Sequence, residues 1–368
     1  MSLFDSVRVG ALQLPNRVVM APLGRARADS VTREPTASVA TYYAQRATAG
    51  LIVSEATHVS ANSVSRPGTS AIHGDGHVAA WRNVTEAVHA AHGRIFQQLF
   101  HLGRKADPTL LPGGGLPGAP SAIAARGVFS TPEGPKPFPV PRAFELHEIP
   151  RVVEEFGNAA ANSRRAGFDG VEVHGANGFL VDQFLRDGAN RRSDRYGGSV
   201  ENRARFMLDV VDAAIDAFGT QRVGVRISPH AKQDGLEDSV PRETFSFVAS
   251  RLQARGIAYL HLIEPATTPD ADRFGPLLRG AFAGPLIVCG GFERVSAEQA
   301  ISKGGADLVA FGAGYIANPD LVARLRLGAP WNTPDPATFY SGGDTGYIDY
   351  PFLAPAGLVA DRTREVHP

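Results

Sequence analysis

Residues 170–199 read GVEVHGANGFLVDQFLRDGANRRSDRYGGS, and the rest of the chain is best interpreted around this stretch. It opens as a buried strand over 170–173 and then presents His174, with Asn177 three residues further on, before a polar and Gly-rich passage. A strand that ends at two neutral hydrogen-bonding side chains is typical of a parallel sheet that delivers polar groups to a ligand at its carboxyl edge. We therefore expect the other segments to build a pocket around His174 and Asn177.

On both sides of residues 170–199, segments with strand patterns alternate with segments with helix patterns. Alternation of this kind predicts parallel strands joined by right-handed crossovers. Eight such units predict an α/β fold of the (β/α)8 TIM barrel type rather than an open doubly wound sheet, and no GxGxxG follows the first strand. The expected strands are 18–23, 51–57, 95–102, 170–174, 223–228, 257–263, 285–289 and 307–311. The expected helices are 38–48, 77–92, 149–166, 201–218, 242–255, 296–303 and 319–327.

Three segments lie outside this alternation. Residues 7–17 predict a short amino-terminal hairpin. Residues 104–147 carry nine of the 27 prolines and six glycines, a composition that excludes a long helix or a central strand. Because this insertion follows the third strand at its carboxyl end, we expect it to cap the pocket, although a plain surface loop is the alternative. We expect one domain over 1–353 and a frayed tail over 354–368.

The composition favours a small, uncharged ligand. Lys and Arg number 37, as do Asp and Glu, so the formal net charge is zero and no basic field attracts nucleic acid or a membrane. No apolar run is long enough to cross a bilayer, and we expect a soluble cytoplasmic protein, as a monomer or homodimer. The single cysteine, Cys289, excludes an internal disulfide, a CxxC zinc site and a cysteine-bound cluster, and we expect no metal.

Several polar residues are candidates for the pocket, each with a structural alternative. Alternation in VGVRIS points Arg226 into the barrel, where either a carboxylate or an electron-rich ligand must compensate its charge. His174 and Asn177 are favoured as ligand-binding groups over a purely structural pair. Gln98 has an amide suited to a heterocycle edge, although the sequence does not reveal its face. Glu172 shares a strand face with His174 and is either an orienting group or an acid.

Glycines follow the seventh and eighth expected strands, at 288–291 and 310–314, and a helix follows each of them. Bare backbone N–H groups and helix amino termini at these two positions form the usual phosphate site of this barrel class. The alternative is that the glycines merely end their strands. Two such turns at the two appropriate strands favour phosphate binding.

Taken together, the motifs resemble the Old Yellow Enzyme family of FMN-dependent ene-reductases, over residues 3–351. The resemblance is carried by NRVVMAPL, YYAQRATAGLIVSEAT, QLFHLGR, AGFDGVEVHGANGFL, DQFLRDGANRRSDRYGGSVENRARF, VGVRISP, GGADLVAFG, IANPDL and TFYSGGDTGYIDYP. It implies that the barrel holds FMN across its carboxyl face. The residues it assigns to the cofactor are Pro22, Leu23, Gly24, Ala56, Gln98 and Arg226 around the ring and ribityl chain, with Cys289, Gly290, Gly312 and Ala313 at the phosphate.

The resemblance also implies a reaction. NAD(P)H reduces the flavin and leaves, and an α,β-unsaturated carbonyl or nitro compound, an enone or a nitroalkene, then takes hydride from flavin N5. His174 and Asn177 match the pair that binds the activating oxygen of the substrate. The family protonates the α-carbon with a tyrosine two residues beyond the asparagine, but here that residue is Phe179. The proton must then come either from water admitted beneath the insertion or from another hydroxyl, for which Tyr340 is the best candidate.

Three further departures from the family pattern stand beside Phe179. Gly24 replaces an expected threonine, and Phe100 in the substrate pocket replaces an expected tryptophan. Ala313 replaces an expected phosphate-binding arginine, whose charged hydrogen bond is worth about 1.5 to 3 kcal/mol. Three functions therefore stay open: an NAD(P)H-dependent ene-reductase, a flavin enzyme of redox-neutral or oxidative type such as a C=C isomerase, and a non-catalytic barrel that binds a small molecule. An iron–sulfur dienoyl reductase is excluded by the single cysteine.

Overall fold

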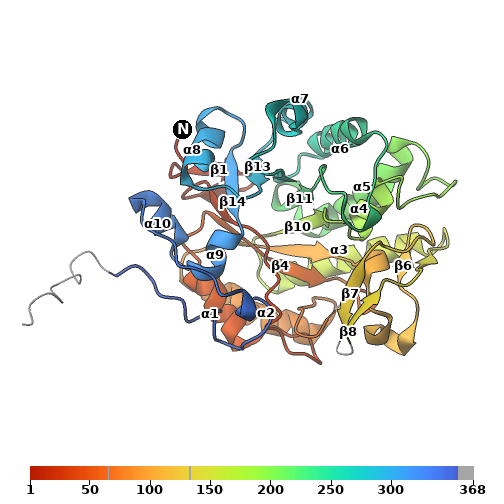
Figure 1. Cartoon of the computed structure of the whole chain (residues 1–368), viewed down its shortest axis with the longest axis horizontal. Helices are drawn as coiled ribbons and strands as arrows, with labels where there is room; N and C mark the ends of the chain where they lie inside the picture. Colours follow the sequence, from red (N-terminus) through yellow and green to blue (C-terminus); the bar gives the residue numbers. More distant parts are fainter. Residues whose placement is uncertain (65, 132–133, 355–368) are drawn as a thin grey trace, which may run out of the picture.

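Eight parallel strands close into a barrel, in the order in which they occur along the chain (Figure 1). The computed structural model describes residues 1–64, 66–131 and 134–354, so all but the first residue of the expected tail lies outside the described residues. The prediction of a TIM barrel is confirmed, with every expected strand present. The strands are β3 (Val18–Met20), β4 (Leu51–His58), β5 (Ile95–Phe100), β10 (Gly170–Gly175), β11 (Val223–Ile227), β12 (Tyr259–Ile263), β13 (Leu286–Cys289) and β14 (Leu308–Phe311).

Helices surround the barrel, and the seven that the sequence predicts are all present. Their buried faces carry large apolar side chains such as Trp81, Phe156 and Phe206, which form the core between helices and strands. Three short helices, α4, α7 and α9, were not predicted. The helices are α1 (Ala37–Gln45), α2 (Asp75–Ala90), α3 (Ile149–Arg165), α4 (Leu180–Leu185), α5 (Val200–Phe218), α6 (Pro241–Arg255), α7 (Gly275–Ala281), α8 (Arg294–Ser302), α9 (Ala313–Ala317) and α10 (Leu321–Leu327).

The predicted amino-terminal hairpin is present as β1 (Val7–Val9) and β2 (Leu12–Leu14), which pair antiparallel. Its apolar side chains, including Val9 and Leu14, belong to the same buried cluster as barrel residues such as Phe96 and Tyr259. The turn needs a glycine, because a Cβ on Gly10 would lie 2.1 Å from the carbonyl oxygen of Gln221. The hairpin therefore covers the amino-terminal end of the barrel strands and leaves their carboxyl end available to a ligand.

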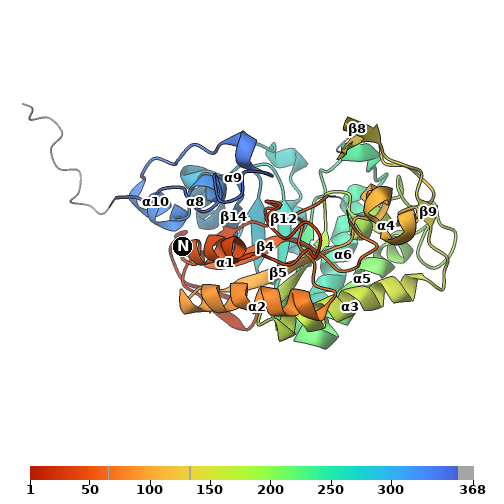
Figure 2. The same ribbon diagram turned by 90° about the horizontal axis from the view of Figure 1, so that it is seen from below.

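The Pro/Gly-rich insertion has no α-helix in its described part, as its composition predicts. The hairpin β7 (Val128–Thr131) and β8 (Gly134–Pro137) projects from the body at the edge opposite α2 and α3 (Figure 2). Its other elements are η1 (Gly103–Lys105), η2 (Pro108–Leu110), η3 (Pro112–Gly114), β6 (Gly118–Ala119) and β9 (Arg142–Ala143). The short turns elsewhere are η4 (Thr220–Arg222), η5 (Gln233–Gly235), η6 (Asp270–Asp272) and η7 (Pro336–Thr338). In the described ranges no helix has the length and apolar character needed to span a membrane.

Candidate active site

A cavity of about 500 Å³ lies at the carboxyl ends of the barrel strands, under residues of the insertion. The insertion contributes Val128, Phe129 and Phe138 to its lining. Ten of the residues selected from the sequence line this one cavity, although they come from segments far apart in the chain. They are Pro22, Gly24, Ala56, Gln98, Phe100, His174, Asn177, Phe179, Arg226 and Tyr340.

The other five selected residues border this set rather than line the cavity. Leu23 follows Pro22, and a Cβ on Gly312 would lie 3.4 Å from the Leu23 side chain. Cys289 at the end of β13 contacts Arg226 through its Sγ, 3.6 Å from a guanidinium nitrogen. Gly290 directly follows Cys289, and Ala313 begins α9 with an exposed side chain. The predicted ring-binding and phosphate-binding groups therefore form one continuous region.

Arg226 is a buried cation that no acidic side chain of the described residues pairs with directly. The register sets it beside His174 on β10 and His261 on β12. Its side chain is buried, and its Nε has no hydrogen-bond partner among the described residues. Because burial of an uncompensated guanidinium is costly, the arrangement favours a ligand in the cavity over a structural ion pair.

Glu172 lies deeper in the barrel, where it is fully buried and fully hydrogen-bonded. It accepts from Gln98 Nε2 at 2.7 Å and from Tyr259 Oη at 3.1 Å, and it pairs with His261 Nδ1 at 2.8 Å. Burial alone raises the pKa of Glu172, but the charge of His261 and its hydrogen bond lower that pKa below the usual value. Burial in turn lowers the pKa of His261, yet Glu172 raises it above the usual range. Glu172 therefore holds its neighbours in position, as an orienting group rather than as an acid.

His174 is the last residue but one of β10, and its surroundings favour the neutral imidazole. Burial lowers the pKa of His174 well below its usual value, and the positive charges of Arg226, His261 and Lys105 lower it further. Its Nδ1 is buried without a partner among the described residues. Asn177 adopts a left-handed backbone (φ 60°) held by a hydrogen bond of 2.8 Å from its N–H to Ser228 Oγ. Both side chains line the cavity, as an uncharged donor pair would.

An aromatic wall adjoins this pair. The Phe179 ring packs edge-on against His174, with 4.9 Å between ring centres, and against Phe100 at 5.2 Å. Sequence reasoning missed Lys105, whose Nζ lies 5.2 Å from the centre of the Phe179 ring. Arg66 and Thr69 also line the cavity and were missed. No periodic pattern marks these three residues, because Arg66 and Thr69 lie in loops and Lys105 ends the single short turn η1.

Tyr340 reaches the cavity but lies at its rim. Its side chain is 59% exposed, and Arg66 lies over its ring, 4.7 Å from the ring centre. The segment around it is anchored from the barrel side, because Arg25 donates to the main-chain oxygens of Phe339 and Gly346. Tyr340, the proton donor suggested by the sequence, is therefore more exposed than Phe179.

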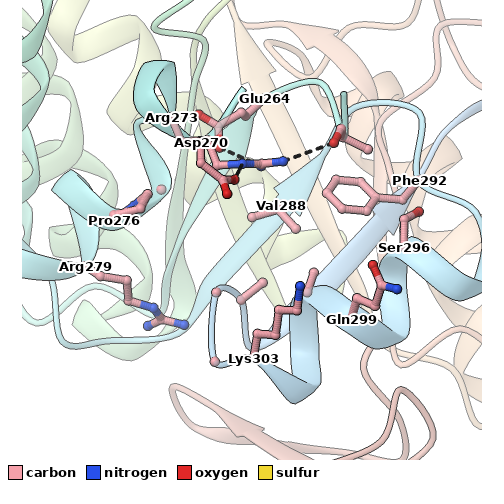
Figure 3. A pocket seen from close by; sticks show the side chains of 16 residues that line it. Glu264, Asp270, Arg273, Pro276, Arg279, Val288, Phe292, Ser296, Gln299 and Lys303 are labelled. Carbon is pink, nitrogen blue, oxygen red and sulfur yellow. Dashed lines mark hydrogen bonds and ion pairs between the residues drawn. The ribbon is translucent and has the colours of Figure 1, made fainter. Parts of the chain in front are cut away.

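A second cavity, of about 520 Å³, lies between α7 and α8 (Figure 3). At one end of it Arg273 bonds to Glu264 and Asp270, and Arg279 pairs with Asp307. Lys303 extends from the opposite side in Figure 3. Two of its cations are thus already compensated, and none of the selected residues lines it. We therefore assign the active site to the first cavity.

The first cavity fits a flavin. The guanidinium of Arg226, the imidazole of His174 and the amide of Gln98 line a space that is open beside Gly24, where a Cβ would meet nothing within 4 Å. Polar groups at the edge of an apolar cavity are what a heterocyclic cofactor requires. Among the described residues no three His, Cys, Asp or Glu side chains gather as a metal site would require. Fold and site define a barrel oxidoreductase that binds a flavin.

The comparisons with known proteins agree with this class. Residues 2–332 match the sequence model of the NADH:flavin oxidoreductase / NADH oxidase family. The chain belongs to this family, which includes the Old Yellow Enzymes, and its cofactor is FMN with a nicotinamide nucleotide as hydride donor. It is 43% identical over 350 residues to a probable flavin mononucleotide-dependent alkene reductase of Leishmania infantum, covering 94% of this chain and 96% of that protein.

Other relatives and solved structures give the same picture. 12-oxophytodienoate reductase 7 of Oryza sativa subsp. japonica is 40% identical over 374 residues, covering 95% of this chain and 94% of that protein. Morphinone reductase in complex with tetrahydroNAD superimposes with a TM-score of 0.92 at 47% identity, over 96% of this chain and 98% of that one. The Old Yellow Enzyme homologue from Zymomonas mobilis superimposes with a TM-score of 0.92 at 42% identity, over 96% of this chain and 100% of that one.

Proposed function

We propose that this protein reduces the activated C=C bond of α,β-unsaturated carbonyl and nitro compounds with NADH or NADPH. The observation that carries the proposal is the pair His174 and Asn177, two uncharged groups on one wall of the cavity that Arg226 and Gln98 also line. The names of its relatives, an alkene reductase and 12-oxophytodienoate reductases, support the same reaction class.

Each side chain has a defined task in this proposal. Bound FMN supplies the hydride that is added to the β-carbon of the substrate. His174, kept neutral by burial and by neighbouring cations, donates a hydrogen bond to the substrate oxygen together with Asn177. These bonds strengthen as negative charge develops on that oxygen, so they stabilise the transition state more than the bound substrate.

Arg226 and the deeper residues would hold the cofactor. The guanidinium of Arg226, which lines the cavity, would provide a positive donor for an electron-rich ring edge, and Gln98 would provide an amide that Glu172 orients. Cys289, Gly290, Gly312 and Ala313 would lie nearest the phosphate. The insertion, through Phe129 and Phe138, would cap the cavity and exclude water from it.

One observation favours a second function, double-bond isomerisation. Phe179 occupies the wall beside His174 with a ring that has no proton to give, so an enolate-like intermediate could collapse another way. Incubation of the FMN-loaded protein with NADH or NADPH and an enone separates the two functions. The proposal expects a saturated ketone formed with equimolar nicotinamide oxidation. An isomeric enone, formed without nicotinamide consumption, would support the second function instead.

A further inference from the structure

The cavity is lined by one partly buried ammonium group that neither the sequence motifs nor the comparisons assign to a function. Lys105 ends η1, directly beyond β5, and its side chain is 13% exposed. Its Nζ lies over the Phe179 ring, 5.2 Å from the ring centre. The ammonium group therefore occupies the wall at which the resembled family carries a tyrosine.

Two acceptors hold this ammonium in place. It forms an ion pair with Asp234 on η5, and it donates to the main-chain oxygen of Asn177 at 3.1 Å. An ammonium has three N–H donors, and in the part of the chain that the structure describes these are its two acceptors. The third N–H has no acceptor among the described residues, and Lys105 lines the cavity. Because Lys105 is tied to Asn177, this N–H is held beside the groups that would bind the substrate oxygen.

We propose that Lys105 is the general acid that protonates the α-carbon of the substrate in place of the missing tyrosine. The inference rests on the proposed function. After hydride addition to the β-carbon, the enolate or nitronate electron pair forms a C–H bond with a proton of Lys105, and the Nζ–H bond breaks. Lys105 is left as a neutral amine and regains its proton from water. Alkylammonium groups and phenols are acids of similar strength in water, so the exchange of a tyrosine for a lysine keeps the chemistry feasible.

The structure favours Lys105 over Tyr340 for this task. Tyr340 is exposed and Arg66 lies over its ring, whereas Lys105 is partly buried and held by two partners. A proton donor must be held within hydrogen-bond reach of the atom it protonates. A partly buried group that two partners hold in place meets that requirement better than a residue at the rim.

Lys105→Met, combined with a nitroalkene substrate, tests the assignment. A nitroalkene accepts hydride without prior protonation and yields a nitronate, which can be distinguished from the nitroalkane by its ultraviolet absorbance. In stopped-flow experiments we expect flavin reoxidation to persist in Lys105→Met, while nitronate protonation slows by about 10²-fold or more. Lys105→Arg keeps the charge but carries a far weaker acid, so it should also accumulate nitronate.

Two measurements separate an acid from a structural residue. Phe179→Tyr in the Lys105→Met background should restore protonation, because it returns a phenol to the same wall. Phenolate affinity, followed by its long-wavelength charge-transfer band, should fall several-fold in Lys105→Met and stay within about two-fold of the original in Lys105→Arg. If Lys105 were only structural, phenolate binding would weaken in both Lys105→Met and Lys105→Arg, and Phe179→Tyr would not restore protonation. That result would overturn the assignment.

Two further outcomes are decisive. If flavin reoxidation and nitroalkane formation are both normal in the two Lys105 variants, the assignment of Lys105 is overturned and the proposed function stands. Loss of nitroalkane formation in Tyr340→Phe would then identify Tyr340 as the acid. Reduced wild-type protein that no nitroalkene or enone reoxidises overturns the proposed function itself, and the assignment with it.

Discussion

Gln98 Nε2 donates a hydrogen bond of 2.7 Å to Oε1 of Glu172, which faces it across β5 and β10. This bond uses one of the two amide N–H groups, so Gln98 can offer its second N–H and its amide oxygen to a ligand. Glu172 accepts in turn from Tyr259 and pairs with His261, so its carboxylate is saturated and has no proton to exchange with a substrate. The buried carboxylate of Glu172 therefore fixes the orientation of the Gln98 amide at the base of the cavity.

Glu172→Gln should lower the free energy of unfolding by about 3 to 5 kcal/mol, because it removes the buried carboxylate that pairs with His261 and whose charge interacts with the buried cation Arg226. Tyr259→Phe, which removes only a hydroxyl from the same carboxylate, should cost about 1 kcal/mol. Urea unfolding of the two variants and the wild type measures the difference. Equal losses in both variants would show that the charge on Glu172 contributes nothing beyond a neutral hydrogen bond.

The same cluster predicts a pH dependence. The folded pKa of Glu172 is depressed, so its contribution to stability is present above its ordinary value of 4.5 and is lost as the pH falls through the folded pKa. The folded pKa of His261 is raised, so its contribution is complete below 6.5 and is lost as the pH rises through the folded pKa. The stability difference between wild type and Glu172→Gln should therefore be largest between these limits and shrink on either side. A difference that grows steadily with alkaline pH would contradict the charged pair.

Strand ends were predictable from sequence, whereas loop contacts were not. The barrel, the hairpin and His174 follow from apolar runs that stop at polar residues, a signal that survives without any tertiary information. Helix α4 was missed because all six of its residues are buried, so no polar face marks it. Lys105 was missed because its partner Asp234, on the short turn η5, and its neighbour Phe179 are distant in sequence and approach it only in the closed barrel.

Ala313→Arg should tighten FMN binding by about 10- to 150-fold, because a charged hydrogen bond to the phosphate is worth about 1.5 to 3 kcal/mol. The exposed side chain of Ala313 leaves room for the change. Ala313→Gln, with similar length and no charge, is the matched control. Flavin fluorescence titration of the apoprotein measures all three affinities. Arg and Gln variants that bind FMN as the wild type does would show that other groups already satisfy the phosphate.

His174→Ala should weaken phenolate binding by at least about 1.5 kcal/mol, because it removes one donor to a charged oxygen. The long-wavelength charge-transfer band of the bound phenol reports the affinity. His230→Ala is a suitable control, since His230 pairs with Glu264 outside the first cavity. Phenolate affinity that is indifferent to both His174→Ala and Asn177→Ala would reduce the pair to a structural role.

The central claim is that this barrel transfers hydride from its flavin to an activated alkene. It is tested most directly by reducing the FMN-loaded protein under anaerobic conditions with one equivalent of NADH and mixing it rapidly with 2-cyclohexenone. We predict that the flavin absorbance returns without oxygen and that one cyclohexanone forms for each flavin reoxidised. A flavin that stays reduced in the presence of saturating enone and nitroalkene, yet reoxidises when air is admitted, would contradict the claim.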